Sequence, residues 1–220
     1  MDNPWIRLPQ SPPFVLQEDR SAIDRFNARA TELHQIHLEL IPEPFLGRPD
    51  APIVLLNLNP GFDPDETRFH QSDPYFIEQS RKNLLHSPIR YPFYLLNPKL
   101  SQSLGHQWWH RKLKAPIAIA GVDKVASRVL CIEYFPYHTK RYKKAAAALP
   151  SQGYSFSLAR QAIQRNALIV IMRSRALWMD AVPELARYAR VFELRNPQNV
   201  SVSPRNCPEG YPRLEEALLA

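Results

Sequence analysis

Short apolar runs divide the chain into a series of predicted strands. The four clearest runs are rich in Val, Ile and Leu and span residues 53–58, 128–135, 167–172 and 190–194. Strands that are apolar at almost every position are typical of a parallel sheet that is covered on both faces. We therefore expect these runs to form a central four-stranded, mainly parallel sheet.

Segments with helical spacing lie between and around these runs. Candidate helices fall near residues 74–86, 156–166, 174–189 and 210–219. Apolar side chains three or four residues apart also predict one helix from Glu18 to Ile41, which Pro42 and Pro44 would end. The alternation of strands and helices predicts a doubly wound α/β fold with three layers, α/β/α.

Two stretches do not follow this alternation. Residues 1–17 contain four prolines, so we expect an extended N-terminal arm that lies over the body of the protein. Residues 87–120 combine aromatic and polar residues without a clear period, and we expect an irregular, aromatic-rich insertion there. Because no repeat or low-complexity linker interrupts the chain, residues 1–220 are expected to form a single domain.

Composition narrows the possible partners. The chain has 28 Lys and Arg against 21 Asp and Glu, a net charge of +7 that favours an anionic partner such as nucleic acid. Its two cysteines are too few for a disulfide framework or an all-cysteine metal cluster. Because the sequence has neither a membrane-length apolar run nor the apolar core of a signal peptide, we expect a cytoplasmic protein without membrane association.

In a doubly wound sheet, ligands bind where the parallel strands end. The run 53–58 leads into an Asn-Pro-Gly turn, where the Asn59 amide could hold a water molecule or bind a carbonyl. A plain strand-terminating turn explains the same residues. Glu133 lies in the second apolar run, and a buried carboxylate is costly unless it is paired or has a shifted pKa.

Basic residues follow two of the predicted strands. Lys140 and Arg141 come after an aromatic turn and His138, a combination that is typical of surfaces that bind single-stranded nucleic acid. Arg173 and Arg175 lie at a strand-to-helix turn that could bind an anion. Solvated basic residues, together with simple capping of the helix, explain both patterns equally well.

The polar loop after the last predicted strand is a further candidate. Ser203 and Arg205 could contact a phosphate backbone there, although an ordinary surface loop has the same composition. Metal binding is not predicted, because His106 and His110 share a helix face without a third ligand nearby. We expect no cofactor.

Taken in order, four segments resemble the motifs of the uracil-DNA glycosylase superfamily. They are LNLNPG at 56–61, VLCIEYFPYH at 129–138, ALIVIMRSRALW at 167–178 and NVSVSPRN at 199–206. The resemblance covers approximately residues 44–218. It implies the fold of that superfamily and a DNA glycosylase activity, in which a base is extruded from single-stranded or damaged DNA and excised.

The resemblance also implies roles for matched residues. Asn59 would hold the attacking water or polarise the base, and Ser203 would lie in the loop that compresses the phosphate backbone. Phe69 or Phe93 would stack on the extruded base.

Two departures from the superfamily pattern leave other functions open. Glu133 stands near the position of a base-recognising Asn, and an ionised carboxylate can only accept hydrogen bonds. The closing loop lacks its histidine, for which His138 is the candidate substitute. The alternatives are a non-catalytic module that binds nucleic acid and an enzyme that acts on a free nucleobase, a nucleotide or an acidic metabolite.

Overall fold

A computed structural model describes residues 1–145 and 147–220. Within them the strands form one five-stranded sheet in the order β1-β3-β2-β4-β5. The four predicted strands are confirmed as parallel neighbours: β2 (Ile53–Asn57), β3 (Val129–Glu133), β4 (Leu168–Ile171) and β5 (Val191–Glu193). The fifth strand, β1 (Phe45–Leu46), was not predicted and pairs antiparallel with β3.

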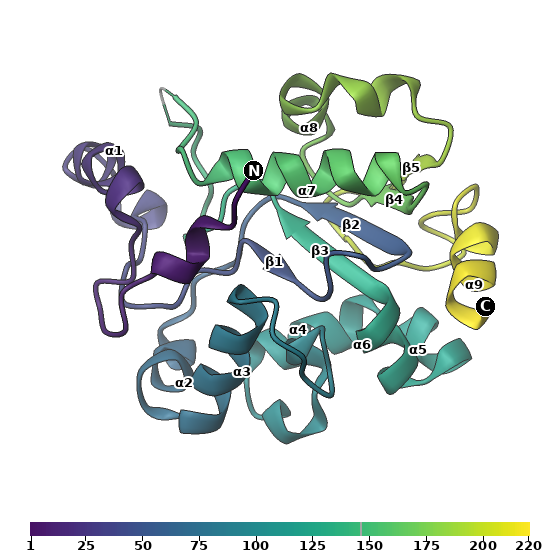
Figure 1. Cartoon of the computed structure of the whole chain (residues 1–220), viewed down its shortest axis with the longest axis horizontal. Coiled ribbons are helices and arrows are strands. Elements are labelled where there is room, and N and C mark those ends of the chain that lie inside the picture. Colours follow the sequence, from purple (N-terminus) through teal and green to yellow (C-terminus); the bar gives the residue numbers. More distant parts are fainter. Residues whose placement is uncertain (146) are drawn as a thin grey trace.

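Helices cover both faces of the sheet, which confirms the three-layer α/β/α arrangement (Figure 1). Successive residues of β2 point to opposite faces. Val54 and Leu56 belong to the cluster formed with α7 (Gln152–Gln164) and α8 (Arg175–Ala181). Ile53 and Leu55 belong to the cluster on the opposite face. The helices that contribute to that opposite cluster are α2 (Thr67–Ser72), α3 (Pro74–Leu84), α4 (Leu104–Lys112), α6 (Val122–Arg128) and α9 (Tyr211–Leu219).

The predicted helix from Glu18 to Ile41 is wrong in its second half. Helix α1 (Gln17–Asn27) ends at Asn27. The Asn27 side chain forms two hydrogen bonds of 2.9 Å with the backbone of Ile36, one to its N–H and one to its carbonyl. Residues 28–36 lie outside the α-helix and contain only a short 3-10 helix at Glu32–His34, and Leu33 on the predicted apolar face is 51% exposed.

The expectation of an irregular insertion at 87–120 is also wrong. This stretch contains α4, α5 (Lys114–Ala120) and two short 3-10 turns. Helix α4 begins after Ser103, whose side-chain oxygen accepts the backbone N–H of His106 at 3.1 Å. Phe93 and Trp109 pack in the core, so the segment is part of one covering layer.

Other predicted boundaries differ from the structure in smaller ways. Residues 174–189 form two elements, because α8 ends at Ala181 and a 3-10 helix follows at Pro183–Arg187. The N-terminal arm is extended except for a 3-10 turn at Pro4–Arg7, and Trp5 and Phe14 are buried in the core. Across residues 1–145 and 147–220, the structure has no helix whose length and hydropathy would suit a membrane span.

The strand register determines where a site can form. Asn57 lies opposite Glu133 in the β2–β3 pair, and Leu56 lies opposite Ile171 in the β2–β4 pair. The carboxyl ends of these three strands therefore finish at the same level, as the strand-end argument from the sequence requires.

Candidate functional site

A pocket of about 450 Å³ opens at the carboxyl ends of β2 and β3. The predicted site residues that line it are Asn59, Glu133, His138, Lys140 and Arg173. They come from three strand ends that are far apart in the sequence. The structure therefore brings together residues that the sequence placed only on separate segments.

The Asn-Pro-Gly turn is fastened to the segment that follows β3. Phe62 donates its backbone N–H to the Thr139 carbonyl at 3.2 Å, and Thr139 donates its own to the Pro60 carbonyl at 3.3 Å. The Asn59 amide nitrogen donates to the Pro60 carbonyl at 2.7 Å and to Thr139 Oγ1 at 3.0 Å. Because these bonds occupy the amide nitrogen, Asn59 offers its Oδ1 as an acceptor for a water molecule.

Asn57 and Glu133 form the inner wall of the pocket, which we call the floor. Asn57 Nδ2 donates to Glu133 Oε1 at 2.9 Å, and Glu133 is 2% exposed. Asn57 Oδ1 and Glu133 Oε2 are both buried, and neither has a hydrogen-bond partner among the described residues. Burial raises the pKa of Glu133 to about 8, so this side chain carries a proton at pH 7.

A protonated Glu133 changes the hydrogen-bonding capacity of the floor. Oε1 accepts from Asn57, so the proton lies on Oε2, which becomes a donor. Asn57 Oδ1 remains an acceptor. The floor therefore offers one unpaired donor and one unpaired acceptor, the same pair that an amide side chain would offer.

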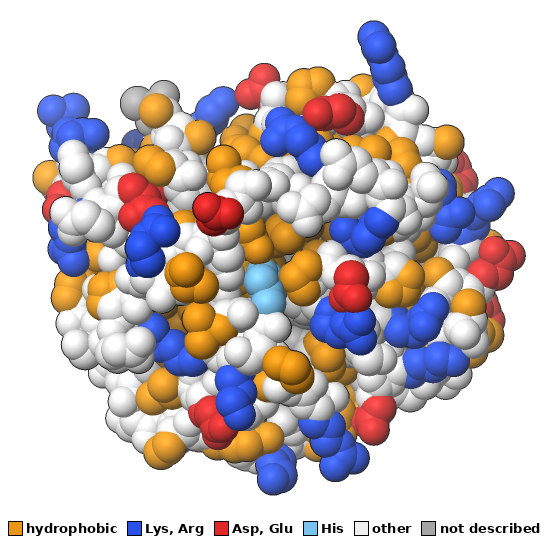
Figure 2. Space-filling model, in the orientation of Figure 1, with side chains coloured by type: hydrophobic (Ala, Val, Ile, Leu, Met, Phe, Trp, Pro, Cys, Tyr) orange, Lys and Arg blue, Asp and Glu red, His pale blue; other side chains and the backbone are white. Residues whose placement is uncertain are grey.

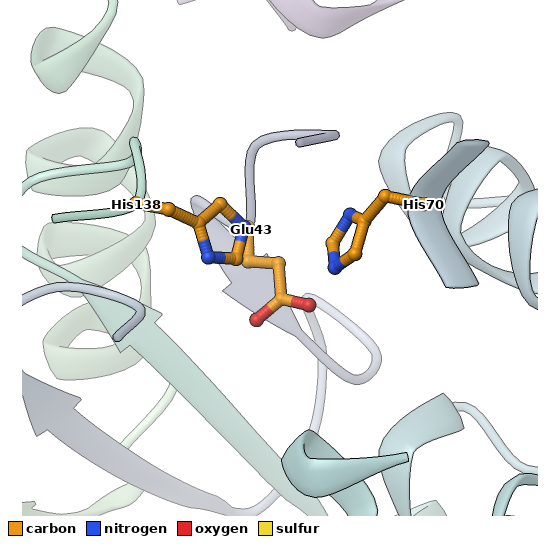
Figure 3. Close-up of side chains that lie close together, drawn as sticks. All are labelled: Glu43, His70 and His138. Carbon is orange, nitrogen blue, oxygen red and sulfur yellow. The ribbon is translucent and has the colours of Figure 1, made fainter. Parts of the chain in front are cut away.

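Glu43, His70 and His138 form a second buried group in the pocket (Figure 3). One ligand atom of each residue lies within 4.8 Å of the others. Tyr94 donates its hydroxyl to Glu43 Oε1 at 2.8 Å, and burial raises the pKa of Glu43 to about 8. Spacing along the chain could not reveal this group, because its members lie on three separate segments.

The hydrogen bonds of this group do not suit a metal ion. His70 Nδ1 accepts the backbone N–H of Ile41 at 3.0 Å, so the neutral ring carries its proton on Nε2. His138 Nδ1 lies 2.7 Å from the Gly61 carbonyl, and its Nε2 lies 2.9 Å from the Ile41 carbonyl. A metal ligand needs a free ring lone pair, and neither imidazole offers one as the described residues place them.

His138 is therefore not placed to replace the catalytic histidine that the closing loop lacks. Its ring is 3% exposed, and both nitrogens face backbone carbonyls of neighbouring segments. Burial lowers its pKa, while the two carbonyls favour the protonated ring. The side chain joins the Asn-Pro-Gly turn to the chain before β1, and it leaves no nitrogen for a ligand.

The predicted basic residues divide into two groups. Lys140 and Arg173 line the pocket, and Lys140 Nζ is 2.8 Å from Glu32 Oε1. Arg175 is paired with Glu193, and Arg141 is exposed outside the pocket lining. Figure 2 shows basic side chains scattered among acidic and apolar ones on the face it presents.

Ser203 and Arg205 lie on a loop beside the pocket rather than in it. The loop is joined to the end of α4, where Val202 donates its N–H to the Lys112 carbonyl at 2.9 Å. Arg111, the residue before Lys112, lines the pocket. Arg205 is exposed and Ser203 is half-buried, so both lie close to a pocket-lining segment without contributing to the lining.

Phe69 and Phe93 are not placed as the stacking role requires. Phe93 is fully buried and its ring lies 4.9 Å from that of Trp109, while Phe69 packs against Phe76 at 5.9 Å. Both rings fill the core between the sheet and its helices. The aromatic side chains that line the pocket among the described residues are instead Phe62, Trp108 and Trp109.

Sequence reasoning missed Asn57, Thr139, Glu43 and His70. Asn57 could have been noticed as the polar residue that ends an apolar run, and Glu43 as an acid between two prolines. His70 carries no such signal. No family model, curated protein or solved structure matches the chain.

Proposed function

We propose that the pocket binds a base of a nucleic-acid strand, and that the protein is a divergent DNA glycosylase of the uracil-DNA glycosylase superfamily. The observation that carries this proposal is the floor, where a protonated Glu133 and Asn57 offer an unpaired donor beside an unpaired acceptor. This pair lies at the same sheet edge as the Asn59 turn.

The floor is complementary to a base edge that carries an acceptor next to a donor. Uracil, hypoxanthine and xanthine have such an edge, because a ring carbonyl adjoins a ring N–H. The carbonyl would accept from Glu133 Oε2, and the N–H would donate to Asn57 Oδ1. A buried polar pair left without partners is costly, so a base that satisfies both atoms gains affinity over one that does not.

The remainder of the pocket suits a nucleotide rather than a free apolar ligand. Its volume of about 450 Å³ lies within the range of roughly 300–1,000 Å³ that is usual for small-ligand sites. Trp108 and the face of Phe62 that is not stacked on His37 offer ring surfaces on which a base can stack. Lys140 and Arg173 can contact the phosphates, which would position the strand without recognising its sequence.

Base release from single-stranded oligonucleotides tests the proposal. The oligonucleotides carry uracil, hypoxanthine, xanthine or an oxidised base, because extrusion costs least in a single strand. We expect wild-type protein to release at least one of these bases, and Asn59→Ala to slow release by about 100-fold through loss of a positioned water. Gln198→Ala, on an exposed loop outside the pocket, is the control. Equal rates for wild type and Asn59→Ala would refute the role of Asn59.

One observation favours a second candidate, a non-catalytic module that binds nucleic acid. Both nitrogens of His138 face backbone carbonyls, so this ring cannot contact a departing base. This candidate predicts a binding constant whose logarithm falls linearly with the logarithm of salt concentration, and it predicts no release of a base. The two readouts of one titration, bound strand and free base, separate the candidates.

A further inference from the structure

Glu43 and His70 form a part of the pocket that base recognition does not use. Tyr94 donates to Glu43 Oε1, so Oε2 is the oxygen that can accept from another donor when Glu43 is ionised. His70 Nε2 is buried, carries a proton and has no partner in the described part of the chain. An unpartnered buried donor is costly, so its placement beside a carboxylate calls for a third group.

Glu43 and His70 lie close enough for a single water molecule to bridge them. Their ligand atoms lie within 4.8 Å of each other, yet no direct hydrogen bond joins them (Figure 3). A water molecule bridges polar atoms at such a separation when two or more partners are available. Here it would accept from His70 Nε2 and donate to Glu43 Oε2.

We propose that Glu43 and His70 hold the water molecule that hydrolyses the N-glycosidic bond, and that Glu43 accepts the proton from this water. The inference rests on the proposed function, since it names the residues that activate the nucleophile in the same pocket. Asn59 lines the same pocket and offers an additional acceptor, Oδ1. Glu43 would therefore be a catalytic residue outside the Asn-Pro-Gly turn.

The reaction balances with groups that the pocket holds. The water oxygen forms a bond to C1′ of the sugar, and one water proton passes to Glu43 Oε2. The bond between C1′ and the base nitrogen breaks, and its electron pair leaves with the base. Glu133 Oε2 gives its proton to the base carbonyl. Solvent then removes the proton from Glu43 and restores one to Glu133.

The charged surroundings support this division of roles. Glu43 is faced by His70, His138, Tyr94 and Glu66. Burial raises the pKa of Glu43 to about 8, so the ionised form that accepts the water proton is a minor fraction at pH 7 and grows as pH rises toward 8. A negative charge on Glu43 adds to the effect of burial in raising the pKa of Glu133, so Glu133 keeps its proton when Glu43 ionises. His70 stays neutral, because burial holds its pKa well below the ordinary value. Its fixed tautomer makes it a donor to water rather than a competing base.

Single-turnover base release tests Glu43 directly. We expect Glu43→Gln to lower the rate by about 100-fold or more while the oligonucleotide Kd changes less than about twofold, since loss of a general base affects the chemical step. The wild-type rate should rise as pH approaches 8 and Glu43 ionises, and this acidic limb of the pH–rate profile should be absent in Glu43→Gln. Glu39→Gln, a partly exposed carboxylate four residues away, is the matched control and should keep the wild-type rate.

His70 gives an independent test. His70→Gln retains an amide donor and should keep more of the rate than His70→Leu. Nitrogen NMR of the wild-type protein should show His70 protonated at Nε2, and this readout does not depend on a variant that folds. A ring protonated at Nδ1 would overturn the proposal, because Nε2 could not then donate to water.

The remaining outcomes separate the two proposals. If wild type releases a base and Glu43→Gln releases it equally fast, the inference fails and the proposed function stands. If wild type releases no base, both fail. Stoichiometric Zn²⁺ binding that is lost in Glu43→Gln would also overturn the inference, because it would make the group a metal site.

Discussion

Replacing Glu133 with Gln should stabilise the protein, and the gain should grow with pH. The carboxyl pKa is about 8 in the folded protein and has an ordinary value of 4.5. Between these values only the folded state retains the proton, so wild-type stability falls as pH rises from 4.5 to 8 and then levels off. The shift corresponds to at most about 5 kcal/mol, since one pKa unit is about 1.4 kcal/mol.

The amide introduced by Glu133→Gln would not titrate, and it has nearly the volume of the carboxyl group. We therefore expect the free energy of unfolding of Glu133→Gln to exceed that of wild type by about 2–5 kcal/mol at pH 9, and by less than about 1 kcal/mol at pH 4.5. Burial and the neighbouring Glu133 together raise the pKa of Cys131, so ionisation of that thiol should move to lower pH in the variant.

Urea unfolding of the two proteins at pH 4.5, 7 and 9 measures this difference. Glu216→Gln, an exposed position in α9, is the control and should show no growing gap. A difference in unfolding free energy between Glu133→Gln and wild type that stays constant from pH 4.5 to 9 would contradict a raised pKa of Glu133. It would mean that Glu133 is already ionised in the folded protein at neutral pH.

Three further predictions concern the fold and the charged rim. Gly47→Ala should destabilise the protein by about 2–4 kcal/mol in urea unfolding, because φ is +114° and the new Cβ would lie 2.3 Å from the Val129 carbonyl. Asp19→Ala should lower the free energy of unfolding by about 2–3 kcal/mol, because buried Asp19 accepts a hydrogen bond from the Tyr137 hydroxyl at 2.7 Å. An unchanged urea midpoint would contradict a stabilising role for this hydrogen bond. Lys140→Gln should reduce, by about 0.7, the steepness with which the logarithm of the single-strand binding constant falls with the logarithm of salt concentration. An unchanged slope would exclude a contact between Lys140 and a phosphate.

The sheet could be predicted from the sequence because its strands are apolar at almost every position. This pattern depends on burial on both faces and needs no knowledge of partners. Strand β1 could not be predicted, because it has two residues and is defined by its pairing with β3. The end of α1 was missed for a similar reason. Apolar spacing continues past Asn27, but bonds from its side chain to Ile36 stop the helix there.

The candidate site was predictable only where topology fixes position. Asn59 and Glu133 follow from the rule that parallel strands end at one sheet edge. Glu43 and His70 reach the pocket through tertiary packing, which sequence spacing does not encode. Phe93 shows the converse difficulty, because an aromatic residue in an irregular sequence looks the same whether it fills the core or lines a pocket.

Affinity for a single base shows whether the pocket recognises a base. The probe is a single strand with one 2′-fluorinated uracil nucleotide, whose glycosidic bond resists hydrolysis, and its reference is the same strand with an abasic analogue at that position. At pH 6.5 we predict that wild type prefers the uracil strand. At pH 9 this preference should fall in wild type and persist in Glu133→Gln, whose amide remains a donor. Equal affinity for the two strands at pH 6.5 would contradict base recognition by this pocket.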